Sequence, residues 1–394
     1  MLYVPLKRLK AGMTLARPIR FATSKEPLVN TGQVLTEKML RRLREFRIIG
    51  AYIEADIAEG VEVKEIISTE EKEEIAEDLK GVYNGFLEER NMSSRLVNDI
   101  FEVSDKLMNI VLSKDEFLLN VIDIKDYDNY TYSHSMYVGI LSMLTGIKLG
   151  LTRGDVSILT TAGLLHDIGK VDVPLDIIQK NGPLSDSERD IMKKHPEFGV
   201  KRLLRLSGIT SEIVGAVYSH HEKVDGTGYP QGIKGDKIPY FGKIIALADV
   251  FDALTSVRSY RNAWHANEVI EYMMGCANTH FDMQLLKTFL KVVAAYPVGM
   301  MVRLSDNTTA LVIKNSESNV LRPTVRILKP GEEVAALGAK RGTEVDLFHE
   351  KEYYNITVKE SLNEAEEGEF FDQGDYFINS GEEKEEIKTE SQQE

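Results

Sequence analysis

The sequence predicts a multidomain protein with a central all-α domain, a small α+β domain before it and a small β-rich domain after it. Three observations lead to this prediction. The chain has 394 residues, which is long for one domain. Apolar residues recur at helical spacing throughout residues 125–295. After Pro297 they give way to short β-branched segments that are separated by turn residues.

Composition indicates a cytoplasmic protein. Apolar residues make up 43% and charged residues 28%, as in soluble globular proteins. No run of about 18 apolar residues predicts a membrane span, and Met1 is not followed by the apolar core of a secretory signal. The single Cys276 excludes an intramolecular disulfide framework and a cysteine-rich zinc site. No nucleic-acid recognition motif accompanies the basic residues, so no nucleic acid polymer is expected as a partner.

The first two segments have different predicted structures. Residues 1–60 are expected to form the small α+β domain, with Thr36 as the N-cap of a helix and a strand at Ala51–Glu54. Residues 64–122 are expected to be a helical linker region that is acidic at its start and apolar at helical spacing afterwards. The pattern fits both a solvated linker helix and a helix that forms a homodimer.

The remaining segments follow in order. Residues 125–295 carry successive helical patterns separated by loops rich in Gly, Pro and Asp, and they form the expected central all-α domain. Residues 297–360 are expected to be a small β domain with strands at Met301–Leu304, Ala310–Ile313 and Pro323–Leu328. Residues 361–394 form an acidic tail that is expected to be disordered. Between Glu360 and Glu394 lie 13 acidic residues and 2 lysines, so most of the net charge of −14 belongs to this tail.

Histidines concentrate in the central domain, where five of the eight lie between positions 134 and 221. A histidine on an apolar helix face is usually a hydrogen-bonded core residue. Asp249 is harder to explain in this way, because a carboxylate within an apolar run must be paired or bound to a metal. Five imidazoles and two carboxylates exceed the four ligands of a structural zinc ion. Their number suits a two-metal site that clamps a phosphodiester, and the mixed donors favour iron or manganese.

Three long motifs make this interpretation specific. The segments Leu164–Lys170, His220–Pro230 and Asp252–Arg261 occur in that order and resemble the HD-GYP family of bacterial cyclic di-GMP phosphodiesterases. The resemblance covers about residues 125–295 and implies the all-α HD-domain fold. It also implies a set of metal ligands, namely His134, His166, Asp167, His195, His220, His221 and Asp249.

The resemblance implies roles for further residues. Together with His166 and Asp167, Lys170 is expected to be catalytic, and it would hold a phosphate oxygen. The expected substrate-binding residues are Lys170, Asp225, Tyr229, Arg258 and Arg261. Guanidinium groups suit phosphate and guanine recognition, although two arginines three residues apart also occur as a solvated pair. Tyr229 is expected either to pack structurally or to stack on a base.

The expected function is therefore the hydrolysis of cyclic di-GMP to pGpG, GMP or both by a metal-bridging hydroxide, which lowers the level of this second messenger. Two alternatives remain. One is an HD phosphohydrolase that acts on another nucleotide, and the other is a non-catalytic receptor for cyclic di-GMP. Some relatives carry a carboxylate four residues before the first histidine ligand and bind a third metal, whereas this chain has Tyr130 there. A neutral phenol is a poor ligand for a hard cation, so two divalent ions are expected.

Overall fold

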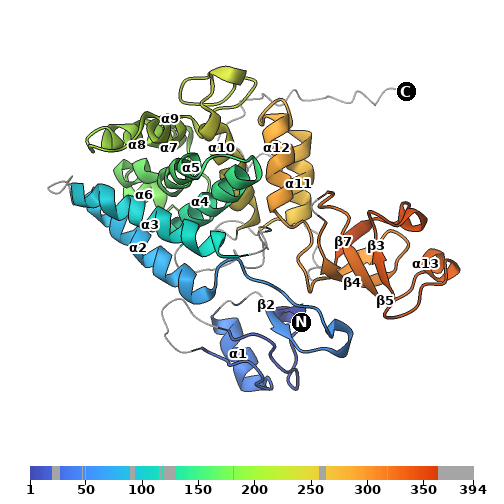
Figure 1. Ribbon diagram of the computed structural model, residues 1–394. Coiled ribbons are helices and arrows are strands. Elements are labelled where there is room, and N and C mark those ends of the chain that lie inside the picture. Colours follow the sequence, from blue (N-terminus) through green and yellow to red (C-terminus); the bar gives the residue numbers. More distant parts are fainter. Residues whose placement is uncertain are drawn as a thin grey trace, which may run out of the picture.

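The computed structural model describes residues 1–19, 27–46, 48, 50–88, 94–114, 118, 130–180, 182–256, 263–316 and 318–362. A helical body lies at the centre, with a small α+β part and a β part beside it (Figure 1). The predicted acidic tail beyond Leu362 lies outside the described residues. Within the described ranges, no helix combines the length and the apolarity needed to cross a membrane.

The first part contains a two-stranded antiparallel sheet and one helix. Strand β1 (Leu2–Pro5) pairs with β2 (Gly50–Ile53), and α1 (Glu37–Glu45) lies between them in the chain. Thr36 caps α1 as the sequence predicts, because its Oγ1 accepts a hydrogen bond from the Met39 backbone N–H. The single-turn 3₁₀ helices η1 (Leu6–Arg8) and η2 (Asp56–Ala58) follow the two strands.

The helical linker region consists of α2 (Thr69–Leu87) and α3 (Ser94–Leu112). Ser68 and Glu71 form a capping box that fixes the start of α2. The two helices are joined by ion pairs of Lys106 with Glu74 and Asp78. Their apolar faces are buried in the same core as the central helices, so both helices pack within this chain.

The central domain is helical, as the sequence predicts. Helices α4 and α10 form its apolar middle, where Leu144 and Phe251 are fully buried. Its elements, in order, are α4 (Tyr130–Lys148), α5 (Arg153–Leu165), η4 (Ile168–Asp172), α6 (Leu175–Ile178), α7 (Asp186–Met192), α8 (His195–Leu203), α9 (Ser211–Ser219), η5 (Gly235–Lys237), α10 (Tyr240–Thr255), α11 (Ala266–Gly275), α12 (Met283–Phe289) and η6 (Leu290–Val292).

The last part is an antiparallel sheet with the strand order β6-β5-β4-β3-β7. The three strands predicted for this part are confirmed as β3 (Met301–Leu304), β4 (Thr309–Lys314) and β5 (Thr324–Lys329). Four further elements were not predicted, namely α13 (Glu332–Ala336), β6 (Glu344–Asp346), η7 (Lys351–Tyr353) and β7 (Val358–Ser361). β7 closes one edge of this sheet against β3.

The first and last parts of the chain pack on each other. Leu311 of β4 is fully buried in the apolar core of the first part. The Tyr3 backbone N–H donates to the Gly299 carbonyl at 2.8 Å, and Arg326 donates to the carbonyls of Ile57 and Glu59. Nothing in the sequence pattern predicts this association, because contacts between distant segments leave no periodic signal.

Candidate metal centre

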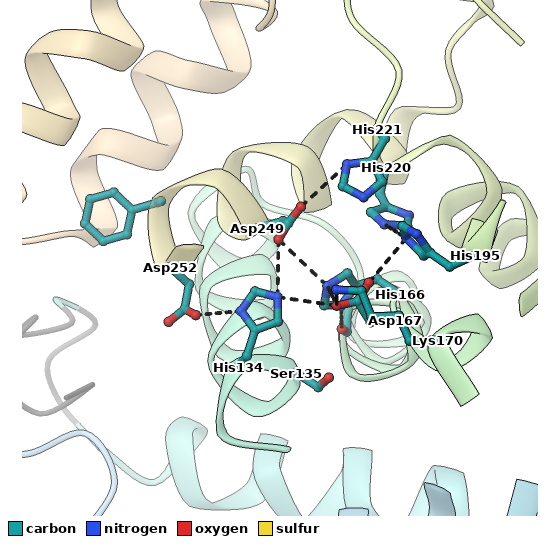
Figure 2. Close-up of polar contacts among 12 residues, drawn as sticks. His134, Ser135, His166, Asp167, Lys170, His195, His220, His221, Asp249 and Asp252 are labelled. Atoms are coloured by element: carbon teal, nitrogen blue, oxygen red, sulfur yellow. Dashed lines mark hydrogen bonds and ion pairs between the residues drawn. The ribbon is translucent and has the colours of Figure 1, made fainter. Parts of the chain in front are cut away.

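The seven predicted ligand residues come together at one place, although they belong to six elements. Figure 2 shows their side chains converging between α4, α5, α8, α9 and α10. Helix ends supply most of them: His166 and His220 end α5 and α9, Asp167 precedes η4, and His195 begins α8. The others are His134 in α4, His221 after α9 and Asp249 in α10. All seven are buried except His221, which is half-buried.

Asp167 lies between two sets of imidazoles. Its Oδ1 is 3.3 Å from His195 Nε2, and its Oδ2 is 3.3 Å from His166 Nε2 and 3.6 Å from His134 Nε2. The ligand atoms of Asp167, His195, His220 and His221 lie within 4.8 Å of one another, as do those of Asp167, His134 and His166. One carboxylate shared by two such sets could supply a ligand atom to each of two cations.

Asp249 completes the second carboxylate position (Figure 2). Its Oδ1 is 3.2 Å from His134 Nε2 and 3.9 Å from His166 Nε2, whereas its Oδ2 is 3.8 Å from His221 Nδ1. Asp249 therefore contacts imidazoles of α4 and α5 on one side and of the α9 end on the other. These contacts with three imidazoles explain why an acidic residue lies within the apolar sequence of α10.

Backbone carbonyls hold three of the imidazoles in one tautomer. The Nδ1–H groups of His166, His195 and His220 donate to the carbonyls three residues earlier, at 2.8, 2.8 and 2.7 Å. Each ring therefore turns its Nε2 toward the other members of the cluster. Such an outer hydrogen bond is typical of metal-bound histidines, because it fixes the tautomer and the ring orientation.

Asp252 also supports the cluster, although it is not among the predicted site residues. Its Oδ2 accepts a hydrogen bond from His134 Nδ1 at 2.6 Å, and the side chain is fully buried. Asp252 orients the His134 imidazole, as the backbone carbonyls orient the imidazoles of His166, His195 and His220. The available signal was its position three residues after Asp249, which places both carboxylates on one side of α10.

The donor set fits divalent metal ions. His166 Nε2 and Asp167 Oδ1 are buried and have no hydrogen-bond partner among the described residues. Buried polar atoms without partners destabilise a protein, and cations between these atoms would satisfy both. Imidazole and carboxylate donors together suit iron, manganese or zinc rather than a soft thiolate-bound ion.

The loop that follows the paired histidines is built against the cluster. The Glu222 carboxylate is buried and accepts hydrogen bonds from the backbone N–H groups of Gln231 (2.7 Å) and Ile233 (3.1 Å). The Tyr229 N–H donates to the His221 carbonyl, and its ring stacks on the His221 imidazole with a centroid distance of 4.6 Å. Glu222 thus ties the far end of the loop to the site, a role that the sequence analysis did not assign.

The predicted substrate residues occupy different positions. Lys170 lies at the centre, where its Nζ is 2.5 Å from Asp167 Oδ2. Asp225 accepts hydrogen bonds from the Thr227 backbone N–H and hydroxyl within the loop. Arg258 and Arg261 lie outside the described residues, as does the side chain of Tyr130. A substrate-binding role for these residues and for Tyr229 stays a prediction.

Burial and charge shift the pKa values of the imidazoles in opposite directions. Burial lowers the pKa of His195 to about 4 and that of His220 to about 3. Burial also opposes the proton on His134, but its hydrogen bonds to Asp249 and Asp252 outweigh this and raise its pKa to about 9. At pH 7 the first two rings are therefore neutral, the state in which imidazole binds metal.

These shifts predict how the stability of the metal-free protein depends on pH. Unfolded histidines titrate near pH 6.5. Below that pH the unfolded chain binds protons that His195 and His220 do not take up until about pH 4 and 3, so stability falls on acidification. The contribution of His134 has the opposite sign and is lost as pH rises toward 9. The free energy of unfolding of chelator-treated protein, measured in urea, should therefore be highest near pH 6.5. A minimum at that pH would contradict the shifts given for His134, His195 and His220.

Comparisons with known proteins agree with the motifs. Residues 122–285 match a family model described as an HD domain. The chain is 37% identical over 226 residues to the cyclic di-GMP phosphodiesterase PA4108 of Pseudomonas aeruginosa, which covers 57% of this chain and 54% of that protein. It is 34% identical over 184 residues to a cyclic di-GMP phosphodiesterase of Thermotoga maritima, covering 45% of this chain and 50% of that protein.

A further relative is named for another substrate. The chain is 33% identical over 232 residues to the 3'3'-cGAMP-specific phosphodiesterase 2 of Vibrio cholerae, which covers 55% of this chain and 44% of that protein. The chain thus spans about half the length of these curated relatives. The match to the HD-domain model and the similarity to these phosphodiesterases agree with the resemblance that the motifs indicate.

Proposed function

Since residues 122–285 match an HD-domain model, we propose that this protein is a metal-dependent phosphodiesterase that hydrolyses cyclic di-GMP. The observation that supports this most directly is the cluster of five imidazoles and two carboxylates, in which Asp167 is shared by two ligand sets. When bound, two divalent ions would supply Lewis-acid activation of water and of the phosphoryl group. Iron or manganese is the proposed metal, because the donors mix imidazole with carboxylate.

The residues of the chain would divide the work between them. His134, His166, Asp167 and Asp249 would hold one ion, while His195, His220 and His221 would hold the other together with Asp167. Lys170 is one-third exposed although its ammonium contacts the buried Asp167. It is therefore placed to neutralise charge on a phosphoryl oxygen as the bond to the leaving oxygen breaks. Arg258 and Arg261 would bind the remaining phosphate or the guanine bases.

The second candidate function is hydrolysis of 3'3'-cGAMP. This candidate rests on the relative in Vibrio cholerae that is named for that substrate. A cytoplasmic location, a homodimer through the helical linker region and the absence of a nucleic acid polymer partner stay predictions. A receptor without turnover is not favoured, since the structure brings all seven predicted ligand residues together.

The test is anaerobic purification, metal analysis and product chromatography with cyclic di-GMP, 3'3'-cGAMP and cyclic di-AMP as substrates. We expect cyclic di-GMP to be converted to pGpG or GMP at the highest kcat/KM, and chelation to abolish the reaction. Preference for 3'3'-cGAMP would select the second candidate. Metal-loaded protein that binds a cyclic dinucleotide without turnover would contradict both.

Metal stoichiometry provides a separate prediction. We expect two equivalents of iron or manganese per chain, because position 130, one helical turn before His134, holds a tyrosine rather than a carboxylate. Tyr130→Glu is expected to raise the number to three, and Tyr130→Gln is the uncharged control. Elemental analysis of anaerobically reconstituted protein measures both. Three equivalents in the wild-type protein would contradict a binuclear centre.

A further inference from the structure

Arg202 lies where three elements around the metal centre meet. It belongs to α8 and is only 7% exposed. Its Nε and Nη2 donate to the two carboxylate oxygens of Asp172 at 2.6 and 2.5 Å, and its Nη1 donates to the Phe86 carbonyl. Asp172 ends η4, and Phe86 lies in the last turn of α2. One guanidinium group therefore joins α2, η4 and α8.

Two of these elements carry proposed site residues. η4 follows Asp167 directly and contains Lys170, while α8 begins at His195. Arg202 is seven residues after His195, so the two side chains project from the same side of α8. The two-pronged contact with Asp172 fixes distance and angle together, which a single-point ammonium cannot do. The position of Lys170 relative to His195 is thus held partly by Arg202.

The same guanidinium caps the C-terminal end of the linker helix α2. The last four carbonyls of a helix lack partners within it, and Phe86 carries one of them. A cation at this end also interacts favourably with the helix dipole. The family match begins at residue 122, so α2 lies outside the HD domain even though its end is capped from within that domain.

Tyr83 links α2 to the other half of the centre. Its hydroxyl is 2.9 Å from Ser135 Oγ and donates to the Leu164 carbonyl at 3.2 Å, and all three residues are buried. Ser135 follows His134, and Leu164 lies two residues before His166. Figure 2 shows Ser135 beside His134 on α4. Tyr83 and Phe86 are one turn apart, so the end of α2 contacts residues that neighbour His134 and His166 and, through Arg202, the helix that begins at His195.

We propose that the C-terminal end of α2 is a positioning element of the metal centre, with Tyr83 of α2 and Arg202 of α8 as the positioning residues. Movement of α2 would change the spacing between His134 and His166, at α4 and the end of α5, and His195 and Lys170, on α8 and η4. The helix follows the small α+β part directly along the chain, so this contact gives that part a physical route to the centre. The inference rests on the proposed function, because it concerns the same metal centre.

The test measures metal binding rather than turnover. Mn²⁺ is titrated into full-length metal-free protein, and free Mn²⁺ is followed by electron paramagnetic resonance. Arg202→Lys keeps the charge but loses the two-pronged contact, and Tyr83→Phe loses only the hydroxyl. Each is expected to weaken Mn²⁺ binding by up to about 10-fold, the lower end of the loss that follows removal of a direct hydrogen-bond partner of a ligand, because Arg202 and Tyr83 act one contact further from the ligands. Asp172→Asn weakens the same contact from its more exposed side and serves if Arg202→Lys does not fold.

The matched control is Arg322→Lys in the β part. Arg322 also donates to backbone carbonyls, including those of Leu347 and Ile356, but lies away from the metal centre. It is expected to lower the melting temperature without changing Mn²⁺ affinity. Unchanged affinity in the Arg202 and Tyr83 variants, with a similar loss of melting temperature, would overturn this inference alone. Wild-type protein that binds neither Mn²⁺ nor, under anaerobic conditions, Fe²⁺ would overturn the proposed function as well.

Discussion

Asp167→Ala is expected to lower phosphodiester hydrolysis by about 1,000-fold or more while the protein stays folded. Asp167 is the carboxylate common to both ligand sets, with Oδ1 toward His195 and Oδ2 toward His166. Its loss removes one ligand from each proposed ion. Each ion contributes several kcal/mol of charge stabilisation in the transition state, and about 1.4 kcal/mol corresponds to a factor of ten in rate.

The fold should tolerate this change because the remaining partner can be solvated. Lys170, whose ammonium contacts Asp167, is one-third exposed and can turn toward water. The control is Asp176→Ala on the exposed side of α6, which should leave turnover unchanged. Turnover, metal content and circular dichroism are measured on the wild-type protein and on both variants. Full metal content with near-normal turnover in Asp167→Ala would refute a two-metal mechanism.

The residues of the cluster could be named from the sequence because the family resemblance carries them over position by position. A histidine followed by an aspartate at a helix end and a carboxylate within an apolar helix are also unusual in a core. Local signals worked equally well at Thr36, where the side chain alone determines the cap, and at β3, whose bounds agree with the predicted strand. Each of these features depends on neighbours within a few residues.

The residues that orient the ligands could not be predicted in the same way. Three of the imidazoles are held by backbone carbonyls, which have no sequence signature. The Tyr83 and Arg202 contacts join residues separated by 30 to 116 positions. Glu222 acts on N–H groups nine and eleven residues later, a distance set by the shape of the loop. Pairings of this kind depend on tertiary geometry, and one sequence carries no record of them.

Gly169→Ala is expected to destabilise the protein by about 3 kcal/mol or more and to disrupt metal binding with it. A Cβ at Gly169 would lie 1.8 Å from the His195 carbonyl oxygen and 2.4 Å from the Gly199 backbone nitrogen. Both atoms belong to the backbone of α8, so no side chain can turn away to make room. The methyl group would force η4 and α8 apart, and these elements carry Lys170 and His195.

The matched control is Gly81→Ala, on the exposed side of α2 where a Cβ would meet nothing within 4 Å. That change should stabilise the protein by about 0.5–1 kcal/mol, because alanine is the better helix former. Urea unfolding and Mn²⁺ titration of both variants separate a general effect of alanine from the contact itself. If Gly169→Ala unfolds at the wild-type urea concentration and binds Mn²⁺ normally, η4 and α8 are not held at this distance in solution.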